Sequence, residues 1–412
     1  MKKFISFIAA ILVLMGANAQ EISSFSAEDL DKEKNYGYFN YFQVSLYRGQ
    51  HLVGDEEVKD FFSDGFNGIG FRFGTQSTGR KEWQRRHLYP QYGLGISFFG
   101  LGGGSVDSLL GKPTSVYFYF GAPIWRFKKS RINSDLEIGL ATDFKPYNQE
   151  TNPYQNYIGA KTNLHFNMSL DYYIQLSNRM DLSFGVNLMH FSNGRTFTPQ
   201  KGINLFGINL STAYNFNPVK NYTKDVKPDY QPQVRPEFIK AEKAPFKGHH
   251  EFILMGSIGT VQAEPGETKD KTGAVDTTGT VGDRYITNSF VAEYAYQFAR
   301  KLKVVAGLDV FYDGSLVNNY DGVNPQDVPF NDRMFYGYHI GGHYLIERFT
   351  FLFNIGSYIY KPFPQRGTWF MRAGGRIGLT PHLDAHVCLK TRNGGVADWI
   401  EWGVAYKFFK DK

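Results

Sequence analysis

The feature that most constrains this chain is an alternation of apolar and polar residues over unusually long stretches. From residue 164 to residue 176, every even position is apolar or aromatic, and the odd positions are polar except Tyr173. Alternation with a period of two indicates a β-strand whose two faces meet different surroundings. Strands of soluble sandwiches usually run for only about five or six residues. Repeated strands of about ten residues or more are typical of a transmembrane barrel, in which lipid contacts one face and the lumen the other.

The same alternation predicts about eight strands on each side of a central segment. The first group comprises residues 38–48, 66–75, 91–101, 114–126, 131–143, 163–176, 180–192 and 203–216. The second comprises residues 250–260, 284–298, 302–313, 334–346, 348–360, 367–379, 382–391 and 397–409. We therefore predict an all-β, antiparallel transmembrane barrel of about eight strands, followed by a second set of about eight. The alternative is one barrel of about sixteen strands, which would enclose water.

Composition excludes several other classes of protein. A hydrophobic content of 42% is too high for a disordered chain. No long uncharged apolar run follows the first twenty residues, which excludes a helical membrane bundle. The single cysteine, Cys388, excludes an intrachain disulfide framework and a cysteine-based zinc site. The net charge of +6 gives no reason to expect a nucleic-acid partner, and no motif indicates a cofactor.

The N-terminus predicts a signal peptide. Lys2 and Lys3 precede an apolar stretch from Phe4 to Met15, and Ala17-Asn18-Ala19 fits a cleavage site. The protein is therefore expected to be exported. The predicted organisation is a signal peptide at 1–19, a first barrel at 20–216, a Pro- and Lys-rich linker at 217–249 and a second barrel-like region at 250–412.

One group of residues points to chemistry. The apolar stripe of strand 180–192 ends in His190 and Ser192, which lie on one face about 6.6 Å apart along the strand. Asn204, near the start of the next strand, is expected on the same face at the same end of the barrel. A histidine can act as general base for a serine hydroxyl. The alternative interpretation is that these polar residues only mark the level at which lipid headgroups begin.

The segment His190-Phe191-Ser192-Asn193-Gly194, followed by Pro199 and Gly202-Ile203, resembles the active-site segment of the PagL-type lipid A 3-O-deacylases. These enzymes are eight-stranded outer-membrane barrels that remove the ester-linked acyl chain at position 3 of lipid A. The resemblance implies a Gram-negative outer-membrane esterase whose membrane partner is lipid A of lipopolysaccharide. Ser192 would be the nucleophile, His190 the base, and Asn193 with Gly194 the stabilisers of the oxyanion.

Two further segments resemble longer relatives of this family, the Bacteroidetes-type acyloxyacyl hydrolases. They are Trp83-Gln84-Arg85-Arg86 with Tyr89-Pro90, and Ile400-Glu401-Trp402-Gly403.

The chain departs from the family at the third member of the triad. The family's glutamate falls on Asn204, whose amide oxygen can fix the histidine tautomer but brings no charge. We therefore expect an esterase slower than its relatives. The alternative is a non-catalytic barrel, either a porin-like channel or a structural or interaction protein.

Polar residues also cluster in the second half of the chain. His339 and His343 share one face of a predicted strand, and Asp384, His386 and Cys388 share one face of another. Each set is expected to face the lumen. A metal site and a cysteine nucleophile are conceivable, but polar filling of the lumen is favoured for both sets. The sequence predicts no particular oligomeric state.

Overall fold

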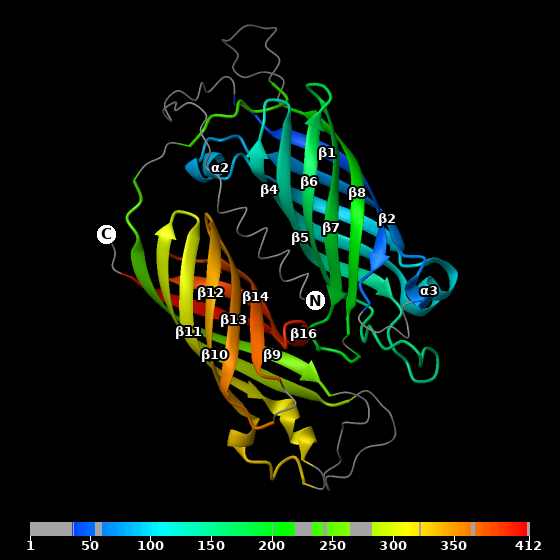
Figure 1. Ribbon diagram of the computed structural model, residues 1–412, viewed down its shortest axis with the longest axis vertical. Helices are drawn as coiled ribbons and strands as arrows, with labels where there is room; N and C mark the ends of the chain where they lie inside the picture. Colours follow the sequence, from blue (N-terminus) through cyan, green and yellow to red (C-terminus); the bar gives the residue numbers. More distant parts are fainter. Residues whose placement is uncertain are drawn as a thin grey trace.

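The computed structural model describes residues 35, 37–53, 60–199, 201–218, 233–241, 245–263, 282–320, 323–363 and 367–409. The predicted signal peptide lies outside these residues. The described residues form two closed antiparallel barrels, one from β1 to β8 and one from β9 to β16 (Figure 1). In each barrel the last strand pairs with the first, β8 with β1 and β16 with β9. The prediction of two eight-stranded barrels is thus confirmed, and a single barrel of about sixteen strands is not formed.

The strands occupy nearly the predicted positions. The first barrel consists of β1 (Phe39–His51), β2 (Phe66–Gln76), β3 (Gln91–Gly100), β4 (Gly111–Arg126), β5 (Ser130–Phe144), β6 (Asn163–Gln175), β7 (Met180–Ser192) and β8 (Ile203–Phe216). The second consists of β9 (His249–Gln262), β10 (Arg284–Ala299), β11 (Leu302–Asp313), β12 (Met334–Ile346), β13 (Phe349–Tyr360), β14 (Trp369–Gly378), β15 (Leu383–Arg392) and β16 (Val396–Phe408). Short helices lie in the connections: η3 (Asp60–Phe62), α2 (Glu82–Arg86), α3 (Gly103–Leu110), η4 (Gly314–Asn319) and η5 (Phe330–Arg333).

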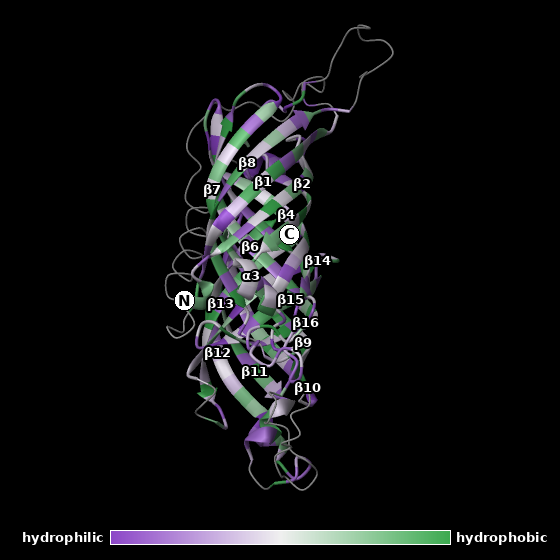
Figure 2. Cartoon of the chain, turned by 90° about the vertical axis from the view of Figure 1, so that its right-hand side faces the viewer, coloured by the Kyte–Doolittle hydropathy of each residue, from purple (hydrophilic) through white to green (hydrophobic). Residues whose placement is uncertain are grey.

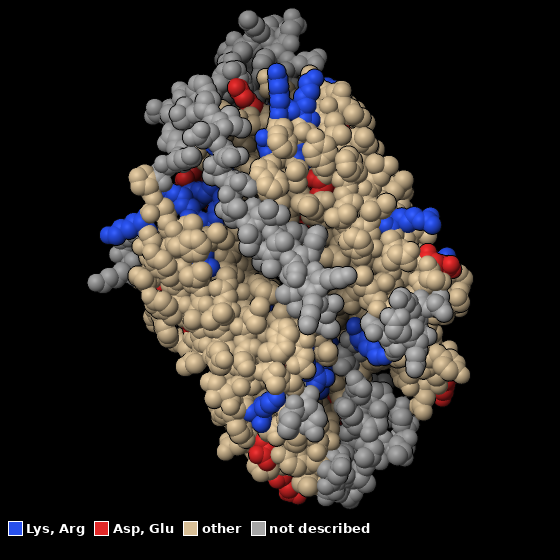
Figure 3. All heavy atoms as spheres, in the orientation of Figure 1, with Lys and Arg blue, Asp and Glu red and all other residues tan. Residues whose placement is uncertain are grey.

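Hydrophobic and hydrophilic residues alternate along the strands (Figure 2), and side-chain burial shows that the apolar residues face outward and the polar residues face the lumen. Phe184 on β7 is 50% exposed and Ile208 on β8 is 61% exposed, whereas Asn187, on the opposite face of β7, is buried. Large areas of the barrel surface carry no charged side chain, as one face of the molecule shows (Figure 3). An apolar belt of this kind is the surface that a β-barrel presents to lipid. No helix among the described residues is long and apolar enough to cross a bilayer.

We name the two ends of the barrels by their connections. β8 ends and β9 begins at the linker end, and β7 ends and β8 begins at the loop end. Connections at the linker end are short, for example residues 127–129 and 300–301. The exception is the link at residues 77–90. It carries α2, and the fold gives a reason for its length because this helix reaches the second barrel.

Side chains fill the lumen of the first barrel. The Arg72 guanidinium contacts the Asp135 carboxylate at 2.8 Å and also binds Glu137, whose other oxygen lies 3.0 Å from the His165 ring. All four side chains are buried. Paired buried charges of this kind occupy the space that a channel would need for water, which argues against the porin-like alternative.

The lumen of the second barrel is filled in the same way. His339 lies 2.7 Å from Asp309 and 3.2 Å from Glu293, and His343 is buried beside the same glutamate. Asp384, His386 and Cys388 are also buried on the lumen side, as predicted, with the cysteine sulfur 3.8 Å from the His386 ring. Among the described residues, no group of three or more His, Cys, Asp or Glu side chains has the arrangement of a metal site.

The two barrels lie side by side (Figure 1) and contact each other at both ends. At the linker end, His87 Nδ1 lies 2.8 Å from the Tyr344 hydroxyl, and Lys81 forms an exposed ion pair with Glu347 at 3.8 Å. Tyr344 belongs to the outward face of β12 and would meet lipid in an isolated barrel. It is only 5% exposed here because the α2 link covers it. At the loop end, the loop that follows β7 contacts the second barrel.

Candidate active site

An aromatic core at the loop end of the first barrel fixes the end of β7. Phe191 points into this core, is fully buried, and contacts the rings of His165, Phe144 and Phe99 at centroid distances of 5.3, 5.5 and 5.8 Å. Because side chains alternate along a strand, an inward Phe191 directs its two neighbours outward. His190 and Ser192 therefore share the outer face of β7, as predicted.

The predicted contact between His190 and Asn204 is present. The two residues are direct partners across β7 and β8, and His190 Nδ1 lies 2.7 Å from Asn204 Oδ1. A carbonyl oxygen can only accept, so the Nδ1–H donates this bond. The neutral ring then carries its free lone pair on Nε2. This is the tautomer that a general base needs for accepting a proton from a hydroxyl.

Ser192 has a different hydrogen-bond partner. Its Oγ accepts the backbone N–H of Gly194 at 3.1 Å, and none of the hydrogen bonds between described residues joins it to His190. The Asn193 side-chain oxygen accepts the backbone N–H of Phe197 at 3.4 Å, which leaves the amide N–H groups of that side chain to act as donors. The Gly194 backbone N–H thus lies at the serine hydroxyl, whereas the Asn193 side chain contacts its own loop at Phe197.

Gly202 packs directly against the pair. Its φ of +69° is in the left-handed region that favours glycine. A β-carbon at this position would lie 3.1 Å from His190 Cε1 and 3.4 Å from Ser192 Cβ. Any larger residue would therefore press on the histidine ring. Sequence reasoning noted Gly202 only as part of a motif and gave it no role.

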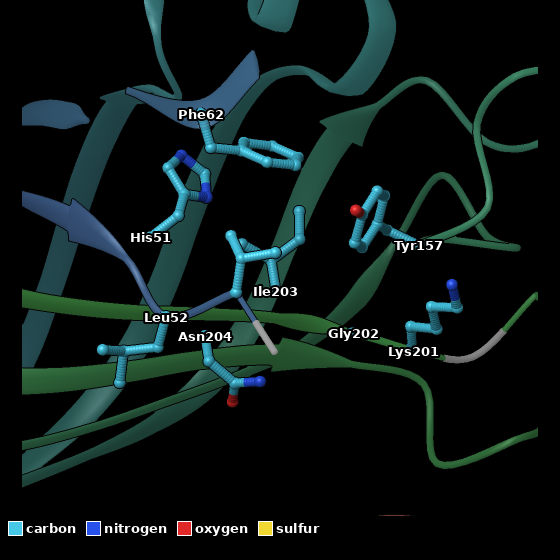
Figure 4. A pocket seen from close by; sticks show the side chains of 9 residues that line it. His51, Leu52, Phe62, Tyr157, Lys201, Gly202, Ile203 and Asn204 are labelled. Carbon is cyan, nitrogen blue, oxygen red and sulfur yellow. The ribbon is translucent and has the colours of Figure 1, made fainter. Parts of the chain in front are cut away.

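A pocket of about 260 Å³ opens on the other side of Gly202 and Asn204. Its walls are mostly apolar or aromatic, and Lys201 carries the one ammonium group among the described residues that line it (Figure 4). The lining residues are His51, Leu52, Val53, Phe62, Tyr157, Lys201, Gly202, Ile203 and Asn204. In Figure 4 the Asn204 side chain extends away from the rings of Phe62 and Tyr157, and its Oδ1 bonds the His190 ring. Asn204 therefore lies between the pocket and the histidine.

The second barrel approaches the same site. Ser192 lies on the outer face of β7, and the alternation along the strand therefore suggested that it contacts lipid. It is only 4% exposed, because another part of the protein covers it. The chain at Gly194 packs on β16, where an added β-carbon would lie 2.5 Å from Ile400 Cγ1. Accordingly Ile400 is 8% exposed, whereas Trp402 on the same face of β16 is 54% exposed. The sequence did not predict this cover.

Comparisons with known families agree with the two halves of the fold. The family of lipid A 3-O-deacylases (PagL) matches residues 67–213, and the C-terminal domain of acyloxyacyl hydrolases matches residues 250–411. The predicted resemblance is confirmed. Each match falls within one barrel, so the PagL-type half is the one that carries His190, Ser192 and Asn204. No curated protein matches the chain significantly.

Solved structures that align with the chain are distant in sequence. Neisserial surface protein A is 8% identical and aligns over 44% of this chain and 100% of its own, with a TM-score of 0.31. The outer-membrane enzyme PagL is 16% identical and aligns over 41% of this chain and 97% of its own, with a TM-score of 0.27. The closed barrels with apolar outer faces and the family matches indicate an outer-membrane protein of a Gram-negative bacterium.

Proposed function

We propose that this protein is an outer-membrane serine esterase that removes the ester-linked acyl chain from position 3 of lipid A. Ser192 is the nucleophile, His190 the general base and Asn204 the residue that orients the histidine. The observation that carries the proposal is the hydrogen bond of 2.7 Å from His190 to Asn204, on the barrel face that also holds Ser192. The match to lipid A 3-O-deacylases over this barrel supports the choice of substrate.

The reaction follows from these roles. His190 Nε2 accepts the hydroxyl proton as Ser192 Oγ attacks the ester carbonyl. The tetrahedral intermediate collapses, the sugar oxygen leaves with the proton returned by His190, and the acyl chain remains on Ser192. Water activated by the same histidine then hydrolyses the acyl-enzyme. Asn204 holds the ring throughout, but it stabilises the imidazolium less than a carboxylate would, so a lower turnover than in Glu-containing relatives is expected.

Donors around the serine suit the negative charge that forms during attack. The Gly194 N–H lies 3.1 Å from Ser192 Oγ, within reach of the carbonyl oxygen on the carbon that Oγ attacks, and the Asn193 amide keeps its N–H donors. Donors that are in place before the reaction stabilise an oxyanion without reorganisation. We assign oxyanion stabilisation to Asn193 and Gly194.

The neighbouring pocket suits an amphiphilic substrate. Its apolar walls, including Leu52, Phe62 and Ile203, fit part of an acyl chain, and the Lys201 ammonium fits a phosphate of the glucosamine headgroup. The loop end, where the pocket opens, then corresponds to the outer leaflet, in which lipid A resides.

Mass spectrometry of lipid A tests the proposal. Cells that express the wild-type protein should contain lipid A lacking the 3-linked acyl chain, and cells that express Ser192→Ala should retain it. Ser183→Ala, on the buried lumen face of the same strand, is the matched control and should behave as wild type. Retention of the chain in wild-type cells, or its loss in the Ser192→Ala cells, would refute the proposal.

A further inference from the structure

The second barrel holds the loop that carries the oxyanion donors of the first barrel, and Arg195 is the centre of this contact. The residue lies three positions after Ser192, in the loop between β7 and β8. It is only 5% exposed although it belongs to a loop at the barrel end. Its guanidinium extends into the loop end of the second barrel, where it lies 2.7 Å from Ser315 Oγ, 3.4 Å from Asp313 and 3.7 Å from Asp398.

Backbone contacts fix the same loop. The Arg195 carbonyl accepts the backbone N–H of Gln262, at the end of β9, at 3.0 Å. The Gln262 side chain in turn accepts the N–H of Thr198 at 3.0 Å, and the Thr198 hydroxyl donates to the carbonyl of Ala263 at 3.2 Å. Ile400 on β16 packs against Gly194 from another side. The loop is therefore bonded to three separate strands or strand ends of the second barrel.

The conformation of the loop needs this support. Gly194 and Arg195 have φ values of +60° and +66°. Left-handed backbone is unfavourable for a non-glycine residue, so the loop alone does not favour this conformation at Arg195. The ion pairs and backbone bonds of Arg195 offset that cost. Because the Gly194 peptide is adjacent, its N–H would lose its direction toward Ser192 Oγ if Arg195 were released.

We infer that Arg195 is a positioning residue of the esterase and that the C-terminal barrel completes the active site by holding the oxyanion loop. The inference rests on the proposed function. It assigns a role to the half of the chain that lies outside the PagL-type match. Arg195 itself does not touch the ester. It acts through Gly194 and Asn193, so its loss should impair the chemical step more than substrate binding.

The test uses the full-length protein in detergent, with a soluble ester to give kcat and KM and a fluorophosphonate to give the rate of labelling at Ser192. Arg195→Gln should lower kcat and the labelling rate by about 10- to 100-fold, because small misplacements of catalytic groups cost this much, while KM changes little. Arg195→Lys should lie between, since an ammonium cannot contact all three partners. Ser315→Ala, on the second barrel, should lower kcat in the same direction.

Two comparisons separate positioning from general damage. Arg333→Gln removes another arginine from the loop end of the second barrel, one that bonds Tyr312 and Val328, and it should keep wild-type kinetics. Asp313→Asn combined with Arg195→Gln should cost little more than Arg195→Gln alone, because both changes break one network. Heat-modifiable migration on gels shows whether the two barrels of each variant are folded.

The outcomes distinguish this inference from the function on which it rests. If the wild type neither hydrolyses the ester nor reacts at Ser192, the proposed function fails, and the inference fails with it. If the wild type is active and folded Arg195→Gln matches it in kcat and labelling rate, only the inference is overturned. A change confined to KM would also overturn it.

Discussion

Asn204 offers the sharpest quantitative prediction, because it occupies the place of a carboxylate in the related enzymes. Asn204→Asp keeps the side-chain length, so an oxygen should remain close to 2.7 Å from His190 Nδ1. The substitution adds a negative charge next to the imidazolium that forms during attack. Two unit charges about 4 Å apart interact by about 4 kcal/mol at an effective dielectric constant of about 20. The half-buried ring retains some access to solvent, which reduces this gain.

A remaining gain of about 1.4–2.8 kcal/mol in the transition state corresponds to a 10- to 100-fold rise in kcat. Asn204→Ala should act in the opposite direction, with a 10- to 100-fold fall, because nothing then fixes the histidine tautomer. Turnover of a soluble ester by purified protein at neutral pH measures both. Asn204→Glu, the family's own residue, tests whether the longer side chain also fits. If the folded Asp variant has a kcat no higher than that of the wild type, the missing negative charge at residue 204 does not limit turnover, and the electrostatic explanation is refuted.

Gly202→Ala should lower kcat about 10-fold, because its β-carbon would press on the His190 ring and left-handed backbone costs alanine about 1–2 kcal/mol. Gly104→Ala is the control, because an added β-carbon there meets nothing within 4 Å, and it should leave kcat unchanged. Lys201→Met should raise KM for lipid A without changing KM for a neutral soluble ester, since only the former carries phosphate; equal effects on both substrates would contradict the phosphate contact. Burial, with the nearby charges of Lys301 and Arg86, lowers the pKa of His87 to about 3. The contact with the second barrel therefore favours neutral His87. This contact should weaken as the pH falls from about 6.5 toward 3, because the ring then becomes protonated. His87→Gln should remove that part of the acid sensitivity of the heat-modifiable transition, and an unchanged profile would refute the assignment.

The fold was predictable because its signal is local and repeated. In β7 and β8, alternation identifies which residues face outward, and antiparallel pairing of neighbouring strands brings their ends together. These two rules were enough to place His190, Ser192 and Asn204 on one face. The contact of 2.7 Å between His190 and Asn204 follows from the antiparallel register of β7 and β8, in which the two residues are direct partners.

The docking of the two barrels was not predictable in the same way. Arg195 is one charged residue in a loop, and its partner Asp313 lies 118 positions further along the chain. No repeating pattern in the sequence connects these two positions. The burial of Ser192 and Ile400 was missed for the same reason. Alternation along a strand indicates which face a side chain lies on, but not whether another part of the protein covers that face. The contact at the opposite end is equally non-local: His87, directly after helix α2, contacts Tyr344, which lies 257 positions further along the chain.

Trapping of the nucleophile tests the central claim most directly. Purified full-length protein would be treated with a fluorophosphonate, which forms a stable adduct only with a serine that an adjacent base activates, and the labelled peptide would be identified by mass spectrometry. The proposed mechanism predicts one adduct, on Ser192, that is absent from Ser192→Ala and greatly reduced in His190→Ala. A protein that removes acyl chains from lipid A while Ser192 stays unlabelled, or that is labelled at another serine, would contradict it.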